Sequence, residues 1–582
     1  MALSGPRPDP GSAADPLDRV HELVTRYSDP HASVARLLCD GHPADAVAYT
    51  VVEPDLSATV LTYGRLKTDS ERFAAALAGL GVGPGDRVAT LMGKSVDYLV
   101  ALLAIWRLGA VTVPLFTAFA PPAIALRLLA SDTKVVICDA PQRAKLAPGA
   151  DIPADAAWRV VVSGGTGHTG DLRFADLLDA HAPGHPAVAL GGDAPLVHIF
   201  TSGTTGRPKG VVVPTAAIAG FRLYAEYGCG VSEDDVFWNA ADPGWAYGLY
   251  FGVIASLSLG VPSVLLHSGF SAGLTWQVMD TLGVTNFTAA PTVYRSLRAS
   301  GVPVPAGLAL RRASSAGEPL TPEINAWAEE AFGIQVHDHY GQTEAGMLVN
   351  NHQLPSLRSP VRPGSMGHPM PGWSLRVLYE DRDEIAPTGT VGRIAADLGA
   401  SPLAWFKGYE GDPVKSAEKF SPDGRWYYTG DVGRVDEEGY FHFSSRDDDV
   451  IIMAGYRIGP FEVESVLVTH PAVVECAVVA APDEVRGEVL EAYVVLQEGA
   501  EASDQLTSEL QQLVKTRFAA HAYPRTVHFT DQLPKTPSGK IQRFVLRQQR
   551  RTDQANPNGP AHPTNLTNPT APTAPTDPGT HA

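Results

Sequence analysis

The segment FTSGTTGRPKG, residues 200–210, gathers more phosphate-binding groups than any other part of this chain. It contains the glycines Gly203, Gly206 and Gly210, the cations Arg207 and Lys209, and the hydroxyl side chains of Thr201, Ser202, Thr204 and Thr205. Glycines allow backbone N–H groups to turn toward an anion, and a lysine adds a mobile positive charge. Short apolar runs rich in β-branched residues lie on both sides. We therefore expect a phosphate-binding loop between two strands, the alternative being an ordinary polar hairpin.

The composition indicates a multidomain globular protein. A chain of 582 residues is too long for one hydrophobic core, so two or more domains are expected. The formal net charge of −18 argues against nucleic acid as a main partner, because nucleic-acid binders need a cationic surface. The four cysteines are too far apart for a metal or redox motif. They are interpreted as small buried apolar residues of a protein in a reducing cytoplasm.

The two ends of the chain differ from its middle. Residues 1–16 are rich in proline, glycine and acidic residues and lack an apolar core, which excludes a signal peptide or an anchor. We expect a mobile arm over residues 1–40 and, from its Pro, Thr, Asn and Ala content, a disordered tail over residues 553–582. Residues 243–277 carry no formal charge if His267 is neutral, but glycine and proline interrupt them. They are predicted to form a buried α/β unit with a strand at residues 263–266, and no stable membrane insertion is expected.

Helical and strand patterns alternate through the first part of the chain. Residues 70–80 and 96–108 are predicted to be helices, the second of them amphipathic, and residues 87–91 and 111–115 strands. Such alternation predicts sheets flanked by helices. After about Asn350 the pattern changes to short strands and turns, which indicates a β-rich subdomain.

A compact α+β domain is expected after Arg446. Strands are predicted at residues 450–453, 473–479, 492–497 and 526–529, and helices at residues 460–469 and 503–518. The predicted domains are therefore residues 41–445 and 446–552, between the arm and the tail.

Four further segments complete the chemistry that the phosphate loop begins. Gly317-Glu318-Pro319 and the segment from Asp338 to Glu344 each follow an apolar run, and ligands bind at the carboxyl ends of strands in α/β proteins. Tyr340 offers a flat face for a purine, Thr343 a hydroxyl for a phosphate, and Glu344 an oxygen ligand for Mg²⁺. In the other two segments, Asp431 and Arg446 can hydrogen-bond to ribose hydroxyls, and Lys540 lies in a Ser-Gly turn.

In this order, the five motifs resemble those of the adenylate-forming enzymes, the superfamily of acyl-CoA synthetases, adenylation domains and luciferase. The resemblance covers roughly residues 45–550. It implies an α/β fold: a large N-terminal domain of two βα sheets plus a β-barrel subdomain, and a small mobile α+β C-terminal domain.

The resemblance also implies a role for individual residues. Lys540 would be catalytic together with Thr343 and Glu344, and Glu344 would hold Mg²⁺. The residues implied to bind ATP or AMP are Thr201, Ser202, Gly203, Thr204, Thr205, Lys209, Gly317, Glu318, Pro319, Asp338, His339, Tyr340, Gln342, Thr343, Asp431 and Arg446. His339 can instead be a packing residue, and Asp431 a turn residue.

The implied reaction has two steps and a thiol acceptor. A carboxylate attacks the α-phosphorus of ATP to give an acyl-adenylate and pyrophosphate, and a thiol then displaces AMP. Gly455, Tyr456 and Arg457 would bind CoA, since a glycine leaves room for the thin pantetheine arm and an arginine can meet a phosphate. Asp448 would be the hinge on which the C-terminal domain turns between the steps.

The acyl pocket is expected from the same resemblance. Its walls would be Trp245, Ala246, Tyr247, Ala316 and Gly341, although Trp245 can equally belong to the core. Acetyl-CoA synthetases have a tryptophan where this chain has Gly341. We therefore expect an open pocket that accepts acids longer than acetate, and a Gly341→Trp variant that shifts preference toward acetate.

The sequence thus predicts a cytoplasmic AMP-forming acyl-CoA synthetase of fatty acid metabolism that uses ATP, Mg²⁺ and CoA. Its acid would be short- to medium-chain or aromatic. Two alternatives stay open: an adenylation enzyme that loads a separate carrier protein, and a non-catalytic nucleotide-binding regulator. The context of Lys540 resembles that of acetylated lysines, so a lysine acetyltransferase and deacetylase are expected partners.

Overall fold

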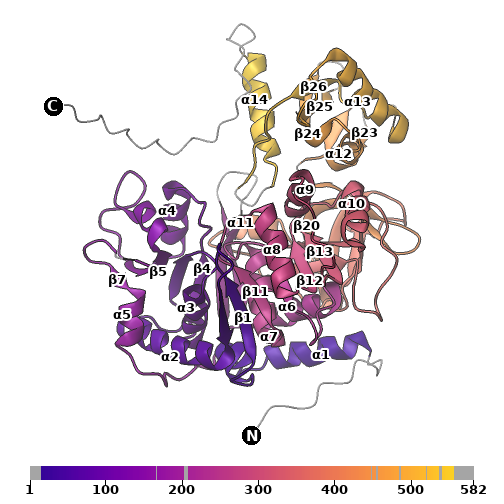
Figure 1. The fold of residues 1–582 in the computed structure, drawn as a ribbon. Coiled ribbons are helices and arrows are strands. Elements are labelled where there is room, and N and C mark those ends of the chain that lie inside the picture. The colour runs from indigo at the N-terminus through magenta and orange to yellow at the C-terminus, as the bar shows by residue number, and fades with distance from the viewer. Residues whose placement is uncertain are drawn as a thin grey trace, which may run out of the picture. The chain divides into compact units, whose positions relative to one another are not determined.

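The computed structural model describes residues 15–165, 167–201, 208–446, 449–453, 456–483, 487–519, 521–536 and 540–555. The chain divides into two compact units, Met1–Phe443 and Ser444–Ala582 (Figure 1). This division lies close to the predicted boundary after residue 445. Both units combine helices with sheets, which confirms the predicted α/β class.

An eight-stranded sheet of the first unit carries the phosphate loop. Its strands, in order across the sheet, are β19 (Tyr409–Glu410), β9 (Lys209–Pro214), β8 (Pro195–Thr201), β4 (Val111–Pro114), β3 (Arg87–Leu91), β5 (Thr133–Asp139), β6 (Arg159–Ser163) and β7 (Leu172–Arg173). β8 and β9 are antiparallel and pair Thr201 with Lys209, so the two ends of the loop lie side by side. The prediction of a loop between two strands is confirmed.

The second sheet of this unit has thirteen strands. In order they are β17 (Leu375–Leu378), β18 (Gly392–Asp397), β20 (Trp426–Val435), β21 (Phe441–Arg446), β16 (Ser365–Pro369), β15 (Gly346–Asn350), β14 (Val336–Gln342), β13 (Arg312–Ala316), β12 (Asn286–Ala289), β10 (Phe237–Asn239), β11 (Ser263–Leu266), β1 (Val47–Val52) and β2 (Ala58–Thr62). The β-rich region predicted after Asn350 corresponds to β16, β17, β18, β20 and β21, which join the rest of this sheet through β15, whereas β19 pairs with β9 in the eight-stranded sheet.

Helices cover the sheets of the first unit, beginning with α1 (Pro16–Tyr27). The helix α3 shows how a fully buried position is reflected in the sequence of a helix. The helices after α1 are η1 (Arg36–Asp40), α2 (Tyr63–Gly79), α3 (Val96–Arg107), α4 (Pro121–Ala130), η2 (Ala140–Leu146), α5 (Phe174–Asp179), η3 (Thr215–Ala217), α6 (Ile218–Leu223), η4 (Tyr224–Gly228), η5 (Tyr247–Ala255), α7 (Ser256–Leu259), α8 (Ala272–Leu282), α9 (Pro291–Ala299), α10 (Pro322–Phe332), η6 (Leu398–Ala400) and α11 (Pro413–Ala417). Ser95 caps α3 by accepting from the Tyr98 amide. Every residue from Tyr98 to Arg107 is buried, so the prediction of an amphipathic helix is wrong.

The N-terminal helix α1 (Pro16–Tyr27) corrects the prediction of a mobile arm over residues 1–40. Asp15 caps it, and Val20, Leu23 and Tyr27 are fully buried in the main core. Arg19 donates from Nε and Nη2 to the carboxylate of Glu226, at 3.0 and 2.7 Å. Apolar burial and a two-point ion pair therefore hold the helix in place. Residues 1–14 lie outside the described part of the chain.

Most of the uncharged segment 243–277 is buried, as predicted, but Phe270 within it is 51% exposed. It forms η5, α7 and β11, with β11 spanning the four residues expected from the sequence, and begins α8. Gly260 ends α7 in the left-handed region, at a φ of 76°. Among the described residues, no helix is both long enough and apolar enough to cross a membrane.

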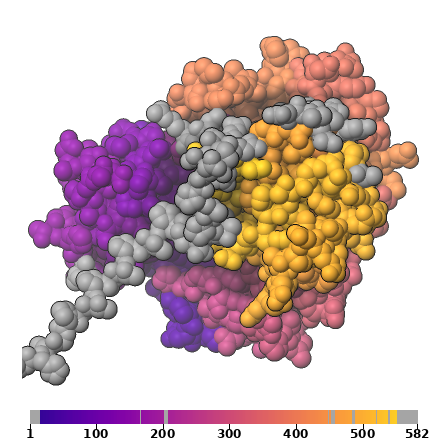
Figure 2. All heavy atoms as spheres, turned by 90° about the horizontal axis from the view of Figure 1, so that it is seen from above, coloured from indigo at the N-terminus to yellow at the C-terminus, as the bar shows by residue number. Residues whose placement is uncertain are grey.

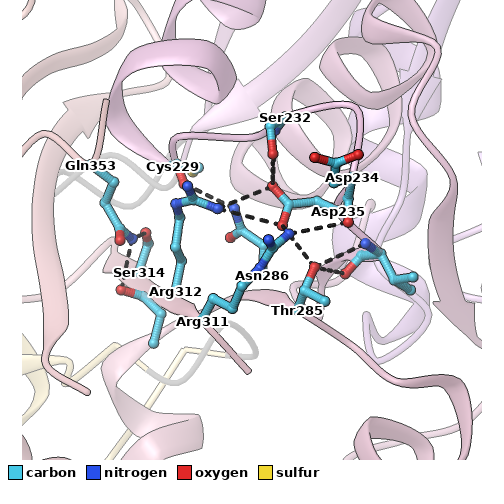
Figure 3. Close-up of polar contacts among 12 residues, drawn as sticks. Cys229, Ser232, Asp234, Asp235, Thr285, Asn286, Arg311, Arg312, Ser314 and Gln353 are labelled. Carbon is cyan, nitrogen blue, oxygen red and sulfur yellow. Dashed lines mark hydrogen bonds and ion pairs between the residues drawn. The ribbon is translucent and has the colours of Figure 1, made fainter. Parts of the chain in front are cut away.

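A polar clamp lies at the amino ends of β10, β12 and β13. The carboxylate of Asp235, whose side chain is fully buried, accepts from Thr285 Oγ1 at 2.7 Å and from Arg311 Nη2 at 2.8 Å (Figure 3). Arg312 Nη1 lies 3.4 Å from it. Asp234 contributes its backbone carbonyl to Arg311. These contacts tie the start of three neighbouring strands together, at the edge opposite their carboxyl ends.

The C-terminal unit has a five-stranded sheet covered by helices. The strands are β23 (Tyr456–Ile458), β22 (Ile451–Met453), β25 (Gly487–Leu496), β24 (Val473–Asp483) and β26 (Thr526–Phe529). The helices are α12 (Pro460–Leu467), α13 (Asp504–Arg517) and α14 (Arg543–Ala555). Figure 2 draws the atoms of this unit in golden orange to yellow. The predicted α+β pattern is confirmed, and α14 is an addition: its Leu546 is fully buried and its Arg543 pairs with Glu464 at 2.7 Å.

Candidate active site

The carboxyl ends of four parallel strands bring the predicted nucleotide residues together. β10, β12, β13 and β14 run parallel, so the segments that follow them meet at one edge of the sheet. Gly317 follows β13 with a φ of 103°, in the left-handed region where glycine is favoured. The segment from Asp338 to Gln342 lies within β14, and Thr343 and Glu344 follow in the turn to β15.

Asp431 is the centre of a hydrogen-bonded group that joins β14 to β20. Tyr340 Oη and Gln342 Nε2 both donate to Asp431 Oδ2, each at 2.5 Å. Tyr427 Oη in turn donates to Gln342 Oε1 at 2.9 Å. Residues about 90 positions apart, predicted to contact the base and the ribose, therefore share one cluster. The interpretation of Asp431 as a simple turn residue is wrong, because it lies inside β20.

Asp338 is a buried carboxyl group with an unused oxygen. Its Oδ2 accepts from the Leu320 amide at 3.3 Å, whereas its Oδ1 has no partner among the described residues. Burial raises the pKa of Asp338 to about 8, because the ionised form loses its hydration. A buried carboxyl oxygen without a partner is costly, so the site fits a ligand that supplies a hydrogen-bonding group, such as the amino group of adenine to the ionised form.

Glu318 is held by residues that sequence reasoning missed. Arg295 Nη2 donates to Glu318 Oε2 at 2.6 Å, and Thr292 Oγ1 lies 3.2 Å from both carboxylate oxygens. Both residues belong to α9, which follows β12. They orient the Gly317-Glu318-Pro319 segment through the carboxylate of Glu318. In the sequence, the only signal for them is their position after an apolar run.

Tyr409 links the cation of the phosphate loop to the predicted magnesium ligand. Its Oη donates to Glu344 Oε1 at 2.8 Å, and Lys209 Nζ lies 4.9 Å from the centre of its ring. β19, which carries Tyr409, pairs with β9, which carries Lys209. Tyr250 Oη donates to the carbonyl of Thr343 at 3.1 Å and steadies the same turn. Neither tyrosine was identified from the sequence.

Glu344 is the residue predicted to bind Mg²⁺. In the part of the chain that the structure describes, no cluster of three or more His, Cys, Asp or Glu side chains is placed to hold a metal. Mg²⁺ is usually held by one or two carboxylates together with substrate phosphates and water. Glu344 can supply such a carboxylate, and Tyr409 links it to the cation Lys209.

Two of the predicted acyl-pocket residues contact aromatic neighbours. Trp245 packs against Phe116 and Phe119, with ring centres 5.5 and 5.4 Å apart, and its buried Nε1 has no hydrogen-bond partner among the described residues. Tyr247 opens η5 and packs edge-on against Phe251. Ala246, just before it, is half-buried, and Ala316 is buried at the end of β13.

Gly341 corrects the prediction of open space. A Cβ atom there would lie 2.3 Å from the carbonyl oxygen of Gly346 and 2.7 Å from Met347 Sδ. The pairing of β14 with β15 shifts register at this residue. The backbone of β15 thus occupies the direction in which an indole would begin. The expectation that Gly341 leaves the volume of a tryptophan open is therefore wrong for this backbone.

The remaining predicted residues fall in the C-terminal unit or outside the described chain. Lys540 is exposed, and its amide donates to Thr536 Oγ1 at 3.0 Å. Arg446 ends β21. For Tyr456 and Arg457 the structure describes the backbone, in β23. The predicted site residues that lie outside the described residues are Ser202, Gly203, Thr204, Thr205, Asp448 and Gly455.

Comparison with known sequences agrees with this geometry. The sequence profile of the AMP-binding enzyme family matches residues 38–409, and that of the AMP-binding enzyme C-terminal domain matches residues 462–540. The chain is 36% identical over 511 residues to the acetyl-coenzyme A synthetase of Bacillus subtilis, covering 84% of each protein. It is 35% identical to the mitochondrial acyl-coenzyme A synthetase ACSM4 of Rattus norvegicus, covering 81% of this chain and 80% of that protein.

Solved structures give the same result. An acyl-CoA synthetase of Brucella canis is 40% identical, with a TM-score of 0.71, and the match covers 94% of this chain and 99% of that one. A benzoate CoA ligase of Burkholderia xenovorans is 32% identical, with a TM-score of 0.78, over 89% of this chain and 99% of that one. The chain belongs to the AMP-binding enzyme family.

Proposed function

We propose that this protein is an AMP-forming acyl-CoA synthetase. It activates a short- to medium-chain or aromatic carboxylic acid with ATP and transfers the acyl group to CoA. The observation that carries the proposal is that residues assigned to base, ribose and phosphate are connected around the end of β14. Asp338 is assigned to the base and the Asp431 cluster to the ribose, and Tyr409 links Glu344 to Lys209, which are assigned to the metal and the phosphates.

The first step needs stabilisation of negative charge. The acid and the α-phosphate of ATP are both anions, and the attack places additional charge on the phosphoryl oxygens. Lys209 and Lys540 are the cations assigned to that charge, and Thr343 donates to the same phosphate. Glu344 would hold Mg²⁺, which would supply further charge neutralisation. The pyrophosphate then leaves, and the acyl-adenylate stays bound through its adenine and ribose contacts.

The second step forms the thioester. The CoA sulfur attacks the acyl carbonyl, the thiol proton is lost, and AMP leaves with the electrons of the broken acyl–phosphate bond. We assign Gly455, Tyr456 and Arg457 to CoA binding. CoA is favoured over a carrier protein because the relatives are named as acyl-CoA synthetases and CoA ligases. A non-catalytic regulator has no comparable support.

Isotope exchange tests the proposal directly. Labelled pyrophosphate should enter ATP when an acceptable acid is present and CoA is absent, because the adenylation step is reversible. Acids to compare are acetate, butyrate, hexanoate and benzoate. Exchange with none of a broad set of acids would contradict the proposed function. Exchange that does not depend on the acid would contradict it as well.

Two finer parts of the proposal need their own tests. We place the protein in the cytoplasm and in fatty acid metabolism, which cell fractionation and the product acyl-CoA can check. We also propose that a lysine acetyltransferase modifies Lys540, since acetylation removes the charge assigned to catalysis. Activity unchanged in a homogeneously acetylated sample would reject this control.

A further inference from the structure

A chain of three hydrogen-bonded polar side chains begins at the predicted wall of the acyl pocket. Tyr247 Oη lies 3.1 Å from Tyr224 Oη, and Tyr224 Oη lies 2.8 Å from His339 Nδ1. His339 Nε2 lies 3.2 Å from the backbone carbonyl of Asn351. This Tyr247–Tyr224–His339 chain joins η5, η4 and β14.

The positions of the protons in the Tyr247–Tyr224–His339 chain follow from the protonation of His339. A carbonyl oxygen only accepts, so His339 Nε2 must carry a proton and donate it to Asn351. Burial lowers the pKa of His339 well below its ordinary value, because the cation would lose its hydration. The imidazole is therefore neutral, and its Nδ1 has no proton. Nδ1 can only accept, so the Tyr224 hydroxyl donates to it.

The same logic extends to Tyr247. Burial raises the pKa of both tyrosines well above the ordinary value, so both hydroxyls keep their protons. Tyr224 uses its single proton in the hydrogen bond to His339, so Tyr247 must be the donor in the contact between the two hydroxyls. The Cys229 sulfur near Tyr224 does not compete, because burial raises the pKa of this thiol to about 11 and a thiol is a weaker acceptor than imidazole.

The Tyr247 hydroxyl oxygen is left as an acceptor for a further partner. Its proton points to Tyr224, and the structure shows no other hydrogen bond to its hydroxyl among the described residues. Tyr247 is half-buried and directly follows Ala246, in the segment assigned to the acyl pocket. A ligand group that donates a hydrogen bond can be satisfied there, whereas one that only accepts would face an oxygen lone pair.

We propose that Tyr247 is a specificity-determining residue that favours carboxylic acids carrying a hydrogen-bond donor, such as a hydroxyl or amino group, at the end remote from the carboxylate. The inference rests on the proposed function and narrows its substrate class. Tyr224 and His339 act through Tyr247 by fixing the direction in which its proton points.

Matched sets of acids test the proposal. One set is 4-hydroxybenzoate, 4-methylbenzoate and 4-formylbenzoate, and the other is 6-hydroxyhexanoate, heptanoate and 6-oxohexanoate. Within each set the size is nearly constant, while the terminal group donates, neither donates nor accepts, or only accepts. We expect the wild type to prefer the hydroxyl member over the methyl member by about two- to tenfold in kcat/KM, in at least one set, as one added hydrogen bond predicts.

Two variants test the roles of Tyr247 and Tyr224 separately. Tyr247→Phe removes the acceptor and should abolish the preference for the hydroxyl member. Tyr224→Phe removes the acceptor for the Tyr247 proton, which can then be donated to a ligand, so the formyl and oxo members should gain. Tyr63→Phe is the matched control, since its buried hydroxyl donates to the Leu257 carbonyl elsewhere in the core, and it should leave all ratios unchanged.

The outcomes distinguish this proposal from the function on which it rests. Equal or greater activity with the methyl member in both sets overturns the role of Tyr247, even if every acid is activated. An unchanged ratio in Tyr247→Phe overturns it too. Absence of acid-dependent pyrophosphate exchange with all acids would instead contradict the proposed function.

Discussion

Asp338 is a carboxyl group that the fold buries before a ligand arrives. Burial raises its pKa from 3.8 to about 8, so between these values it is protonated in the folded chain and ionised in the unfolded chain. The folded state then holds the additional proton, and stability falls as the pH rises through this window. Relative to Asp338→Asn, the nucleotide-free wild type should lose up to ~1.4 kcal/mol of unfolding free energy per pH unit between pH 5 and 8.

Urea denaturation of both proteins measures this difference. Saturating ATP should reduce the pH dependence, because the amino group of adenine gives the ionised carboxylate a donor. Parallel stability curves for the wild type and Asp338→Asn would show that Asp338 titrates normally and would remove it from the base site.

Lys540 should separate the two half-reactions. Lys540→Ala is expected to lose adenylation by several orders of magnitude, since even one neutral hydrogen-bond donor at a developing negative charge is worth roughly 10²–10³ in rate. Thioester formation from supplied acyl-AMP should continue, because that step develops no phosphoryl charge. Lys535→Ala is a suitable control, as Lys535 pairs with Glu475 at 2.7 Å in the same unit. Equal loss of both half-reactions would reject the assignment.

At the scale of elements, the polar clamp holds the amino ends of three strands. Asp235→Ala removes the acceptor shared by Thr285, Arg311 and Arg312, and should cost about 1–3 kcal/mol of unfolding free energy. Asp234→Ala, next to it on an exposed side chain, should change stability by less than about 0.5 kcal/mol. Burial opposes the ionisation of Asp235, but its hydrogen bonds and the charge of Arg312 outweigh burial and hold its pKa below the ordinary value. The contribution of Asp235 to the unfolding free energy should therefore disappear only in strong acid. Similar denaturation midpoints for the two variants would contradict this structural role.

The bulge at Gly341 predicts a folding defect where the sequence predicted a change of substrate. Gly341→Ala should cost about 1–3 kcal/mol, because its Cβ would meet the Gly346 carbonyl, and Gly341→Trp should cost more. Gly273→Ala, a glycine in α8 with no atom near its Cβ direction, should not destabilise the protein. A Gly341→Trp protein of wild-type stability that prefers acetate would restore the open-pocket explanation.

Local patterns predicted the elements well where burial and period agree. The limits of β3, β11 and β26 match the predicted ones, because a short apolar run between turn residues is typical of a strand. The predicted amphipathic face of α3 is absent because the helix is buried on all sides. The motif residues of β14 and β20 were identified by their order in the chain, although no local signal showed that Asp431 meets Tyr340.

Contacts between distant residues were beyond sequence reasoning. Tyr409 reaches Glu344 from a strand 65 residues later, and Arg295 reaches Glu318 from a helix 23 residues earlier. An isolated tyrosine or arginine has no pattern that reveals its partner. The register shift at Gly341 was hidden for the same reason, because it depends on how β14 pairs with β15.

At the scale of the whole molecule, the division into two units agrees with a reaction in two steps. Lys540 and Gly455 belong to the same C-terminal unit and are assigned to different steps, and we propose that this unit rotates between the steps. We propose Asp448, which lies outside the described residues, as the hinge. Asp448→Pro restricts φ and should leave adenylation near the wild-type rate while slowing thioester formation at least tenfold. Wild-type rates in both half-reactions, measured by pyrophosphate release and by acyl-CoA formation, would place the hinge elsewhere.

The central claim is that one chain joins an acid to CoA through an acyl-adenylate. Its most direct test is the quantitative analysis of all products after incubation with ATP, Mg²⁺, CoA and an accepted acid. We predict AMP, pyrophosphate and acyl-CoA in equal amounts over many turnovers and, when CoA is omitted, at most about one equivalent of enzyme-bound acyl-AMP. Formation of ADP and phosphate, or multiple turnovers to AMP without any acyl-CoA, would contradict the account.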